Sequence, residues 1–285
     1  MKDPIILIDA NSIGARAVFT VGNLSFQEMP TGVIYGFLKE VQRIFEEFKT
    51  NRICFFWDAK ASLRKLFFPN YKVKRSDNRT QREKDVWIVA HEQYDLLRDE
   101  ILPSIGWKNQ FYADGFEADD LLAQAVSQLP WNEKLIMVTT DEDMYQCLQA
   151  CDIYNQASKK VITTKTFEDK YGIKPERWAE VKSIAGCKSD EVPGIVGVGE
   201  KTAIKFLNGE LKRTTKAYQN IVCPNGTAII HRNRQLVTLP FKDTPTLRFQ
   251  KNELSLDNFV QICEKYGMVS LLGHYSLRSW EDTLK

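Results

Sequence analysis

The chain has 285 residues, 43% of them hydrophobic and 27% charged, with a net charge of +2. This composition is typical of a soluble globular protein with one large domain or two modest ones. The sequence excludes a membrane-spanning class, because no apolar run approaches the roughly 20 residues of a span, and its first apolar run is too short for a signal peptide. The six cysteines form no CxxC pair, so they indicate neither a zinc site nor a disulfide framework, and a reducing cytosol is expected.

Three short apolar runs predict buried strands of a parallel sheet. They are Ile5–Ile8, Arg52–Trp57 and Leu135–Thr140. Helical periodicity, as in Val33–Phe48, separates the runs and predicts βαβ units, and a hairpin is expected within 151–165. Each run ends at an aspartate: Asp9, Asp58 and Asp141. Ligand sites of such sheets lie at the carboxyl ends of the strands, so these three side chains are expected to lie together.

The stretch Gly115–Asp120 adds three carboxylates at the start of a predicted helix. The helix dipole stabilises one or two acids in a first turn, but three repel one another unless a cation lies among them. The predicted metal ligands at this edge are Asp9, Asp58, Glu117, Asp119, Asp120, Asp141 and Asp143. Oxygen ligands of this kind favour Mg²⁺ or Mn²⁺.

Zinc is not favoured, because no histidine or cysteine converges with these acids in the sequence. The three histidines, His91, His231 and His274, lie elsewhere along the chain and are expected to be structural or exposed.

The segment from Lys60 to Lys84 is strongly basic, with nine lysines or arginines against two acids, and the aromatic residues Phe67, Phe68 and Tyr71 are interleaved. A charge run can be a solvated face. Cations with interleaved rings favour a groove for a nucleic-acid strand, where cations meet phosphates and rings stack on bases. A helix from about Gln81 to Leu102 follows.

A glycine-rich segment, Gly186–Ala203, joins two predicted helices. Its glycines at 194, 197 and 199 lead into a helix that carries Lys201 and Lys205. Backbone N–H groups at a helix start, with lysines nearby, suit non-specific contact with a phosphate backbone. Further on, turns are expected at Pro224–Gly226 and Pro240, and a terminal helix and tail over 252–285.

Together these motifs resemble the 5′ nucleases, which comprise phage flap endonucleases and 5′→3′ exonucleases and the nuclease domain of bacterial DNA polymerase I. The resemblance covers roughly Ile5 to Pro240. The motifs that carry it are Leu7–Asn11, Phe56–Asp58, Tyr71–Arg75, Glu117–Asp120, Thr140–Asp143 and Gly186–Ala203.

The resemblance implies an α/β, PIN-like fold with a mostly parallel twisted sheet flanked by helices, a helical arch and a C-terminal helix–three-turn–helix region that grips DNA. It implies a catalytic domain over 1–175 with the arch at about 60–102. A helical C-terminal region would span 176–285, with the helix–three-turn–helix at about 181–207.

The resemblance also implies residue roles. The basic residues near the scissile phosphate would be Lys72, Arg75 and Arg16, and Asp190 would join the metal ligands. The DNA-binding residues would be Tyr71, Lys74, Arg79, Gly197, Gly199, Lys201 and Lys205. Two Mg²⁺ or Mn²⁺ ions are implied, with K⁺ at the helix–three-turn–helix.

One departure concerns the second metal. The family pattern Gly-Asp-x-x-Asp-Asn is here Gly186–Glu191, with Cys187 in place of the first aspartate and Glu191 in place of the asparagine. A thiol is a poor ligand for Mg²⁺. The second ion is therefore expected to bind more weakly, to favour Mn²⁺ or to borrow Glu191.

The implied function is a metal-dependent, structure-specific 5′ nuclease that acts on DNA with 5′ ends, flaps or nicks, in replication or repair. The balance of exonuclease and flap endonuclease activity stays open, and an RNA–DNA hybrid is a further candidate substrate. A catalytically weak DNA-binding protein and a PIN-type ribonuclease are the alternatives. The resemblance implies a monomer in a bacterial or phage-infected cytosol, without a membrane partner.

Overall fold

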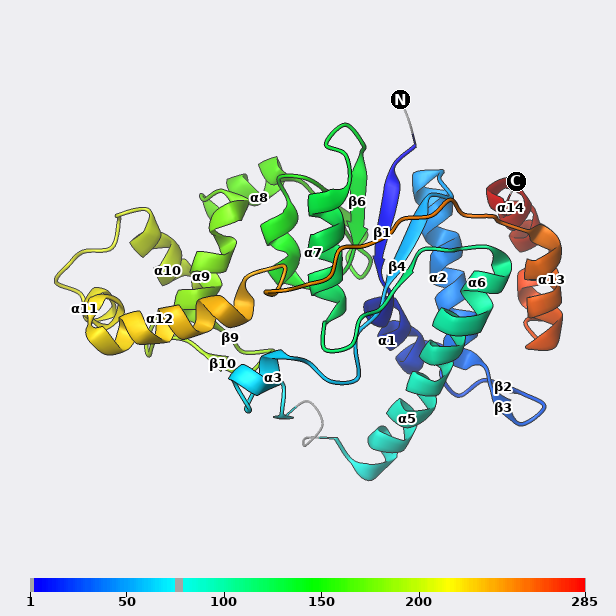
Figure 1. Cartoon of the computed structure of the whole chain (residues 1–285), viewed down its shortest axis with the longest axis horizontal. Helices are drawn as coiled ribbons and strands as arrows, with labels where there is room; N and C mark the ends of the chain where they lie inside the picture. The colour runs from blue at the N-terminus through cyan, green and yellow to red at the C-terminus, as the bar shows by residue number, and fades with distance from the viewer. Residues whose placement is uncertain (1–2, 75–78, 285) are drawn as a thin grey trace.

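A computed structural model describes residues 3–74 and 79–284, and a six-stranded sheet lies at its centre (Figure 1). In sheet order the strands are β5 (Gln110–Phe111), β4 (Ile53–Phe56), β1 (Ile5–Asp9), β6 (Leu135–Val138), β7 (Asp152–Asn155) and β8 (Lys160–Ile162). The first five pair in parallel, and only β8 pairs antiparallel, with β7. The mostly parallel sheet is thus confirmed, and the expected hairpin is β7–β8. The short strand β5 was not expected.

Both faces of the sheet are covered, because the central strands are apolar on both sides. In β1, Ile6 and Ile8 pack into one core, whereas Ile5 and Leu7 pack into the other. Figure 1 shows these two layers as separate groups of helices on either side of β1 and β4.

The helices of the first face come from both ends of the chain. They are α1 (Ala10–Val21), α2 (Gly32–Phe48), α5 (Gln81–Leu96), α6 (Leu102–Ile105), α13 (Leu256–Lys265) and α14 (His274–Leu284). A π-helical turn, Leu97–Ile101, joins α5 to α6, so the long helix predicted there is present. Two helices replace the expected terminal helix and tail. Their rings Phe259 and Trp280 stack at 4.0 Å, and Trp280 also contacts Phe45 of α2.

The helices on the other side come from residues 118–237. They are α7 (Ala118–Gln128), the 3₁₀ helix Glu142–Cys147, α8 (Thr164–Tyr171), the 3₁₀ helix Pro175–Arg177, α9 (Trp178–Ala185), α10 (Glu200–Leu207), α11 (Lys216–Val222) and α12 (Pro224–Val237). Of these, α7 lies nearest the sheet, and α10 and α12 pack against α9 farther from it (Figure 1). A two-stranded hairpin, β9 (Gly186–Cys187) with β10 (Val192–Pro193), lies between α9 and α10. The remaining short elements are β2 (Ser25–Phe26), β3 (Met29–Pro30), α3 (Arg64–Phe67) and the 3₁₀ helix Val269–Leu272.

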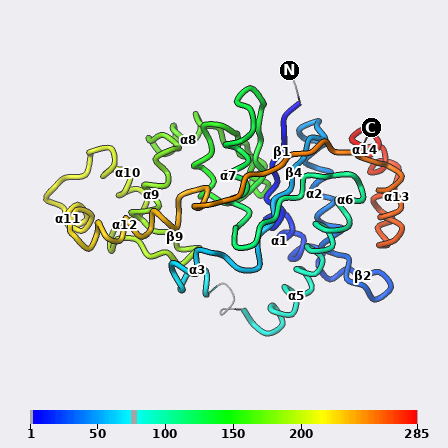
Figure 2. The backbone as a smooth tube through the Cα atoms, viewed as in Figure 1, coloured from blue at the N-terminus to red at the C-terminus, as the bar shows by residue number. Residues whose placement is uncertain are grey.

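The segment 238–255 connects the two layers (Figure 2). It runs from α12 to α13 without a regular helix or strand. The Gln250 N–H donates to Asn109 Oδ1 at 2.8 Å, and the Glu253 N–H donates to Gly106 O at 2.8 Å. The last two helices therefore belong to the same core as the N-terminal residues, although they lie far from them in sequence.

One local expectation was wrong. The predicted turn Pro224–Gly226 is the first turn of α12, because proline suits the first position of a helix and the Cys223 side chain caps it. The residues after Asp9 form α1, and the Asp9 carboxylate caps that helix. Among the described residues, no helix is both long enough and apolar enough to cross a membrane.

Candidate active site

A pocket of about 600 Å³ opens at the carboxyl ends of β1, β4 and β6. Five of the predicted metal ligands line it: Asp9, Asp58, Asp119, Asp141 and Asp143. They come from three strand ends and the first turn of α7, as the parallel sheet requires. The structure therefore brings together most of the acids that the sequence singled out.

Backbone and hydroxyl donors orient these carboxylates. Asp9 Oδ1 accepts from the Ser12 N–H at 3.0 Å, and its Oδ2 accepts from the Thr139 hydroxyl at 2.9 Å. Asp58 Oδ1 accepts from the N–H of Ala118 at 2.8 Å, which ties the end of β4 to the start of α7. The acidic groups are thus held in place by neutral donors that do not balance their charge.

Burial and mutual repulsion make these groups hard to ionise. Burial and the nearby Asp58 raise the pKa of Asp9 to about 7. Burial, followed by Asp141 and Asp9, raises the pKa of Asp119 well above its usual range. The pKa of Asp141 is also raised, by burial and by Asp143. A hard divalent cation with oxygen ligands offsets such repulsion, so this donor set fits Mg²⁺ or Mn²⁺.

The metal-free protein is expected to lose stability as pH rises from about 4 to about 7. The folded-state pKa of Asp9, about 7, lies above the unfolded value of about 4, so its stabilising contribution is complete at low pH and is lost as pH rises through 7. The loss is at most roughly 4 kcal/mol in the free energy of unfolding. Thermal unfolding in a chelator measures it. Saturating Mg²⁺ and the Asp9→Asn substitution should each make stability less dependent on pH. If the stability of the metal-free wild type did not change with pH, the raised pKa of Asp9 would be contradicted.

A second cluster lies beside this pocket. One ligand atom each of Asp143, Cys187 and Asp190 lies within 4.8 Å of the others. The Cys187 thiol donates to Asp143 Oδ2 at 3.4 Å, and burial and Asp143 raise its pKa to about 12, so it stays neutral. Lys182 Nζ lies 3.1 Å from Asp143 Oδ1 and 3.0 Å from Glu200 Oε1. This cluster already contains a buried cation and an uncharged thiol, which makes it a poorer site for Mg²⁺ than the pocket.

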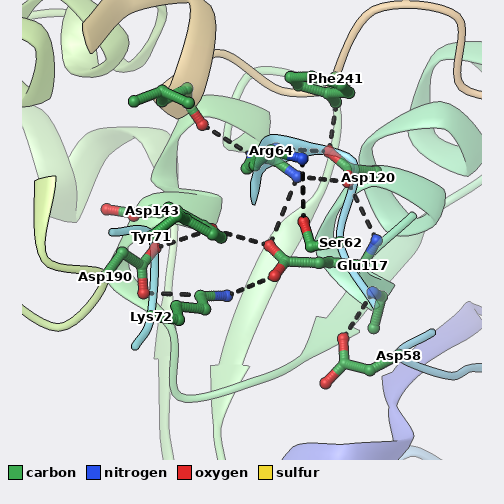
Figure 3. Close-up of polar contacts among 12 residues, drawn as sticks. Asp58, Ser62, Arg64, Tyr71, Lys72, Glu117, Asp120, Asp143, Asp190 and Phe241 are labelled. Carbon is green, nitrogen blue, oxygen red and sulfur yellow. Dashed lines mark hydrogen bonds and ion pairs between the residues drawn. The ribbon is translucent and has the colours of Figure 1, made fainter. Parts of the chain in front are cut away.

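Asp120 departs from its predicted role as a metal ligand. It is fully buried, and Arg64 binds both of its oxygens, at 2.6 and 2.7 Å (Figure 3). Oδ1 also accepts from the Phe241 N–H at 2.9 Å, and Oδ2 accepts from the Glu117 N–H at 3.1 Å. With two donors on each oxygen, this carboxylate forms a structural ion pair and does not line the pocket.

Glu117 is the N-cap residue of α7 and contacts Tyr71 and Lys72 of the basic segment. Its Oε1 accepts from Lys72 Nζ at 2.9 Å, and its Oε2 accepts from the Tyr71 hydroxyl at 2.9 Å (Figure 3). Burial alone would raise the pKa of Glu117, but Lys72 and Arg64 lower it below its usual range. The Tyr71 ring is only 2% exposed, and its hydroxyl also donates to Asp190 Oδ2 at 3.2 Å. The prediction that Tyr71 stacks on DNA is therefore wrong for this conformation.

The other predicted basic residues are divided among several places. Lys72 and Arg79 line the acidic pocket, and the Arg79 guanidinium lies 4.3 Å from the centre of the Trp87 ring. Arg16 does not line it, since its guanidinium binds Gln156 O at 2.9 Å and pairs with Glu40. Arg75 lies outside the described residues.

The predicted DNA-binding glycines lie at a separate pocket. Gly197 and Gly199 line a hollow of about 570 Å³ with Lys74 and Lys188. The lysines of α10, Lys201 and Lys205, are exposed. The Lys74 N–H donates to both oxygens of Glu191, so the Glu191 carboxylate is bound to the basic segment. In this conformation it does not take part in the cluster of Asp143, Cys187 and Asp190, where it was expected as a substitute ligand.

Sequence reasoning missed three residues of the site. His91 lines the acidic pocket, so the expectation that the histidines lie elsewhere was wrong for it. Lys182 was not singled out, although it pairs with Asp143. Arg64 was counted among the groove cations but is buried. No local pattern marks Arg64 or Lys182, because each pairs with an acid more than 30 residues away.

The comparisons with known proteins agree with this geometry. A family model described as "5'-3' exonuclease, N-terminal resolvase-like domain" matches residues 4–172. The chain is 28% identical over 262 residues to the 5′-3′ exonuclease of Buchnera aphidicola subsp. Schizaphis graminum, which covers 90% of this chain and 88% of that protein. It is 30% identical over 274 residues to DNA polymerase I of Mycobacterium leprae, covering 87% of this chain and 29% of that protein.

Among solved structures, a bacteriophage T5 flap endonuclease in a pseudo-enzyme–product complex with DNA and metal ions has the same fold. Its TM-score is 0.69 at 17% identity, with 97% of this chain and 96% of that chain covered. The family match spans more than half of the chain and includes every strand-end acid of the pocket. The chain therefore belongs to the 5′-3′ exonuclease family that this N-terminal domain defines.

Proposed function

We propose that this protein is a metal-dependent, structure-specific 5′ nuclease that hydrolyses DNA phosphodiesters near 5′ ends, flaps or nicks during replication or repair. The observation that carries the proposal is the pocket that gathers five carboxylates with the arch cations Lys72 and Arg79. Carboxylates there suit divalent metal ions, and the cations suit a phosphodiester. The relatives named as a 5′-3′ exonuclease and a flap endonuclease with DNA and metal ions support it.

In the proposed mechanism, Asp9, Asp58, Asp119 and Asp141 hold the divalent cation. When bound, the cation supplies an activated water and stabilises charge on the phosphoryl group. Lys72 contacts the phosphate oxygens and offsets their charge, provided that it leaves Glu117. The acids have no covalent role. Specificity is for structure, because contacts with phosphates carry no sequence information.

A second ion would lie at Asp143 and Asp190, weakened by Cys187, and K⁺ at the Gly186–Ala203 element, which would act as the helix–three-turn–helix. We propose the catalytic and C-terminal regions at 1–175 and 176–285, a monomer, and activity on an RNA–DNA hybrid. Six free cysteines support a reducing cytosol.

The deciding experiment is cleavage of a 5′-labelled flap by the purified protein in Mg²⁺, in Mn²⁺ and in a chelator. Metal-dependent products near the junction are expected, and nicked duplex, single-stranded DNA and an RNA–DNA hybrid resolve the substrate range. Flap binding without cleavage in either metal would favour the DNA-binding alternative. Activity on RNA alone would favour the PIN-type ribonuclease.

A further inference from the structure

Arg64 is the buried exception in an otherwise basic and solvated segment. Its side chain is 2% exposed, and it lies at the start of α3. It binds Asp120 in a bidentate pair, and its Nε donates to Leu236 O at 2.8 Å. One guanidinium thus joins α3, α7 and the end of α12 (Figure 3).

The Arg64–Asp120 pair is expected to stay ionised and hydrogen-bonded. Burial alone would lower the pKa of Arg64, but its hydrogen bonds and charge interaction with Asp120 raise it above its usual value. The Arg64–Asp120 pair does not line the acidic pocket, so neither partner serves there as a ligand or a phosphate contact. A buried ion pair gains little net stability over apolar packing, so stability alone does not account for it.

The pair holds Glu117, the N-cap residue of α7, whose partner Lys72 lines the pocket. Through Asp120 it fixes the Glu117 N–H, and Arg64 Nη1 itself lies 3.4 Å from Glu117 Oε2. The oxygens of Glu117 therefore differ. Oε2 is held by two buried groups, Tyr71 and Arg64, whereas Oε1 is held by Lys72, which is 15% exposed and lines the pocket. Asp119 follows two residues later in the same helical turn.

We propose that Arg64 is a positioning residue for the metal centre. Its contacts with Asp120 and with Glu117 Oε2 fix the first turn of α7, so that Asp119 faces the pocket and Glu117 presents Oε1. Lys72 is the exchangeable partner of that oxygen. This inference rests on the proposed function. It predicts that a substitution at Arg64 weakens the affinity of the protein for the metal ion and leaves its affinity for DNA unchanged.

The test variant is Arg64→Lys, which keeps the charge but loses the bidentate geometry. Disturbed support for a metal ligand costs about 10- to 100-fold in metal affinity or activity. We expect the Mg²⁺ midpoint for flap cleavage, and the Mn²⁺ affinity measured by calorimetry on the chelator-stripped protein, to weaken by that range. Flap affinity in a chelator should stay unchanged. If Arg64→Lys had the same Mg²⁺ midpoint for flap cleavage and the same Mn²⁺ affinity as the wild type, the proposal would be overturned.

Arg98→Lys is the matched control, because Arg98 forms an equally short bidentate pair with Asp99, at 2.7 Å on both oxygens, on the surface. It should leave metal affinity unchanged. If Arg64→Lys does not fold, the double variant Arg64→Gln with Asp120→Asn removes both buried charges together and tests the same point. If the double variant folds and binds Mn²⁺ as tightly as the wild type, the pair serves stability alone. The same conclusion follows if neither Arg64→Lys nor the double variant folds in saturating Mn²⁺. A wild-type protein that binds Mn²⁺ but cleaves no flap would reject the proposed function instead.

Discussion

Asp119→Asn is expected to reduce metal-dependent flap cleavage by about 1,000-fold while the variant still binds flap DNA. Asp119 lines the acidic pocket from the first turn of α7, and repulsion from Asp141 and Asp9 adds to burial in raising its pKa. Asparagine keeps the shape of the side chain but removes a charged metal ligand. Loss of about 4 kcal/mol of transition-state stabilisation corresponds to this factor.

The variant should also separate catalysis from folding. Because the substitution removes one repelling carboxylate, the metal-free variant should unfold at a temperature equal to or above that of the wild type. Single-turnover cleavage and a binding assay in a chelator measure activity and DNA affinity, and thermal unfolding measures stability. Asp114→Asn is the control, since Asp114 is exposed, binds the Tyr112 hydroxyl and does not line the pocket. If Asp119→Asn cleaved the flap as fast as the wild type, the assignment of the acidic pocket as the active site would be wrong.

The strand-end acids could be predicted because topology alone gathers them. A parallel sheet carries the ends of its strands to one edge, so Asp9, Asp58 and Asp141 needed only three apolar runs to be placed together. The structure confirms the parallel pairing of β1 with β4 and β6 on which this placement depends.

The division between Asp119 and Asp120 could not be predicted in the same way. Neighbouring residues on a helix point about 100° apart, so one can face the pocket while the other faces away. Which one does so depends on Arg64, 56 residues earlier in the chain. Similarly, Tyr71 and Arg64 looked like groove residues because a sequence shows charge and aromatic content but not burial.

The charge balance of the cluster around Asp143, Cys187 and Asp190 depends on a distant contact as well. The resemblance to the family pattern implies that Cys187 stands in place of an aspartate, but the sequence did not indicate that Lys182 lies against Asp143. Burial alone would lower the pKa of Lys182, but Asp143 and Glu200 raise it, so the ammonium stays charged. The deficit of negative charge in this cluster is therefore larger than the single substitution suggests.

Cys187→Asp is expected to lower the Mg²⁺ concentration needed for half-maximal cleavage by about tenfold, which corresponds to about 1.4 kcal/mol. In the wild type, the neutral thiol donates a hydrogen bond to Asp143 and also hydrogen-bonds with the Ser189 hydroxyl, but it brings no negative charge to the cluster. A carboxylate there would add a third oxygen ligand beside Asp143 and Asp190 and would compete with Lys182 for the charge of Asp143. Cleavage titrations in Mg²⁺ and in Mn²⁺ measure the change.

Cys187→Ser separates charge from the loss of sulfur, because serine is similar in size and neutral. We expect this control to keep the wild-type response to Mg²⁺, whereas Cys187→Asp should gain more in Mg²⁺ than in Mn²⁺, since the harder ion depends more on oxygen ligands. The added carboxylate should also destabilise the metal-free protein, because it increases repulsion with Asp143 and Asp190. If the aspartate and serine variants respond to Mg²⁺ alike, Cys187 does not limit the second ion, and Lys182 becomes the residue that sets the metal requirement of this cluster.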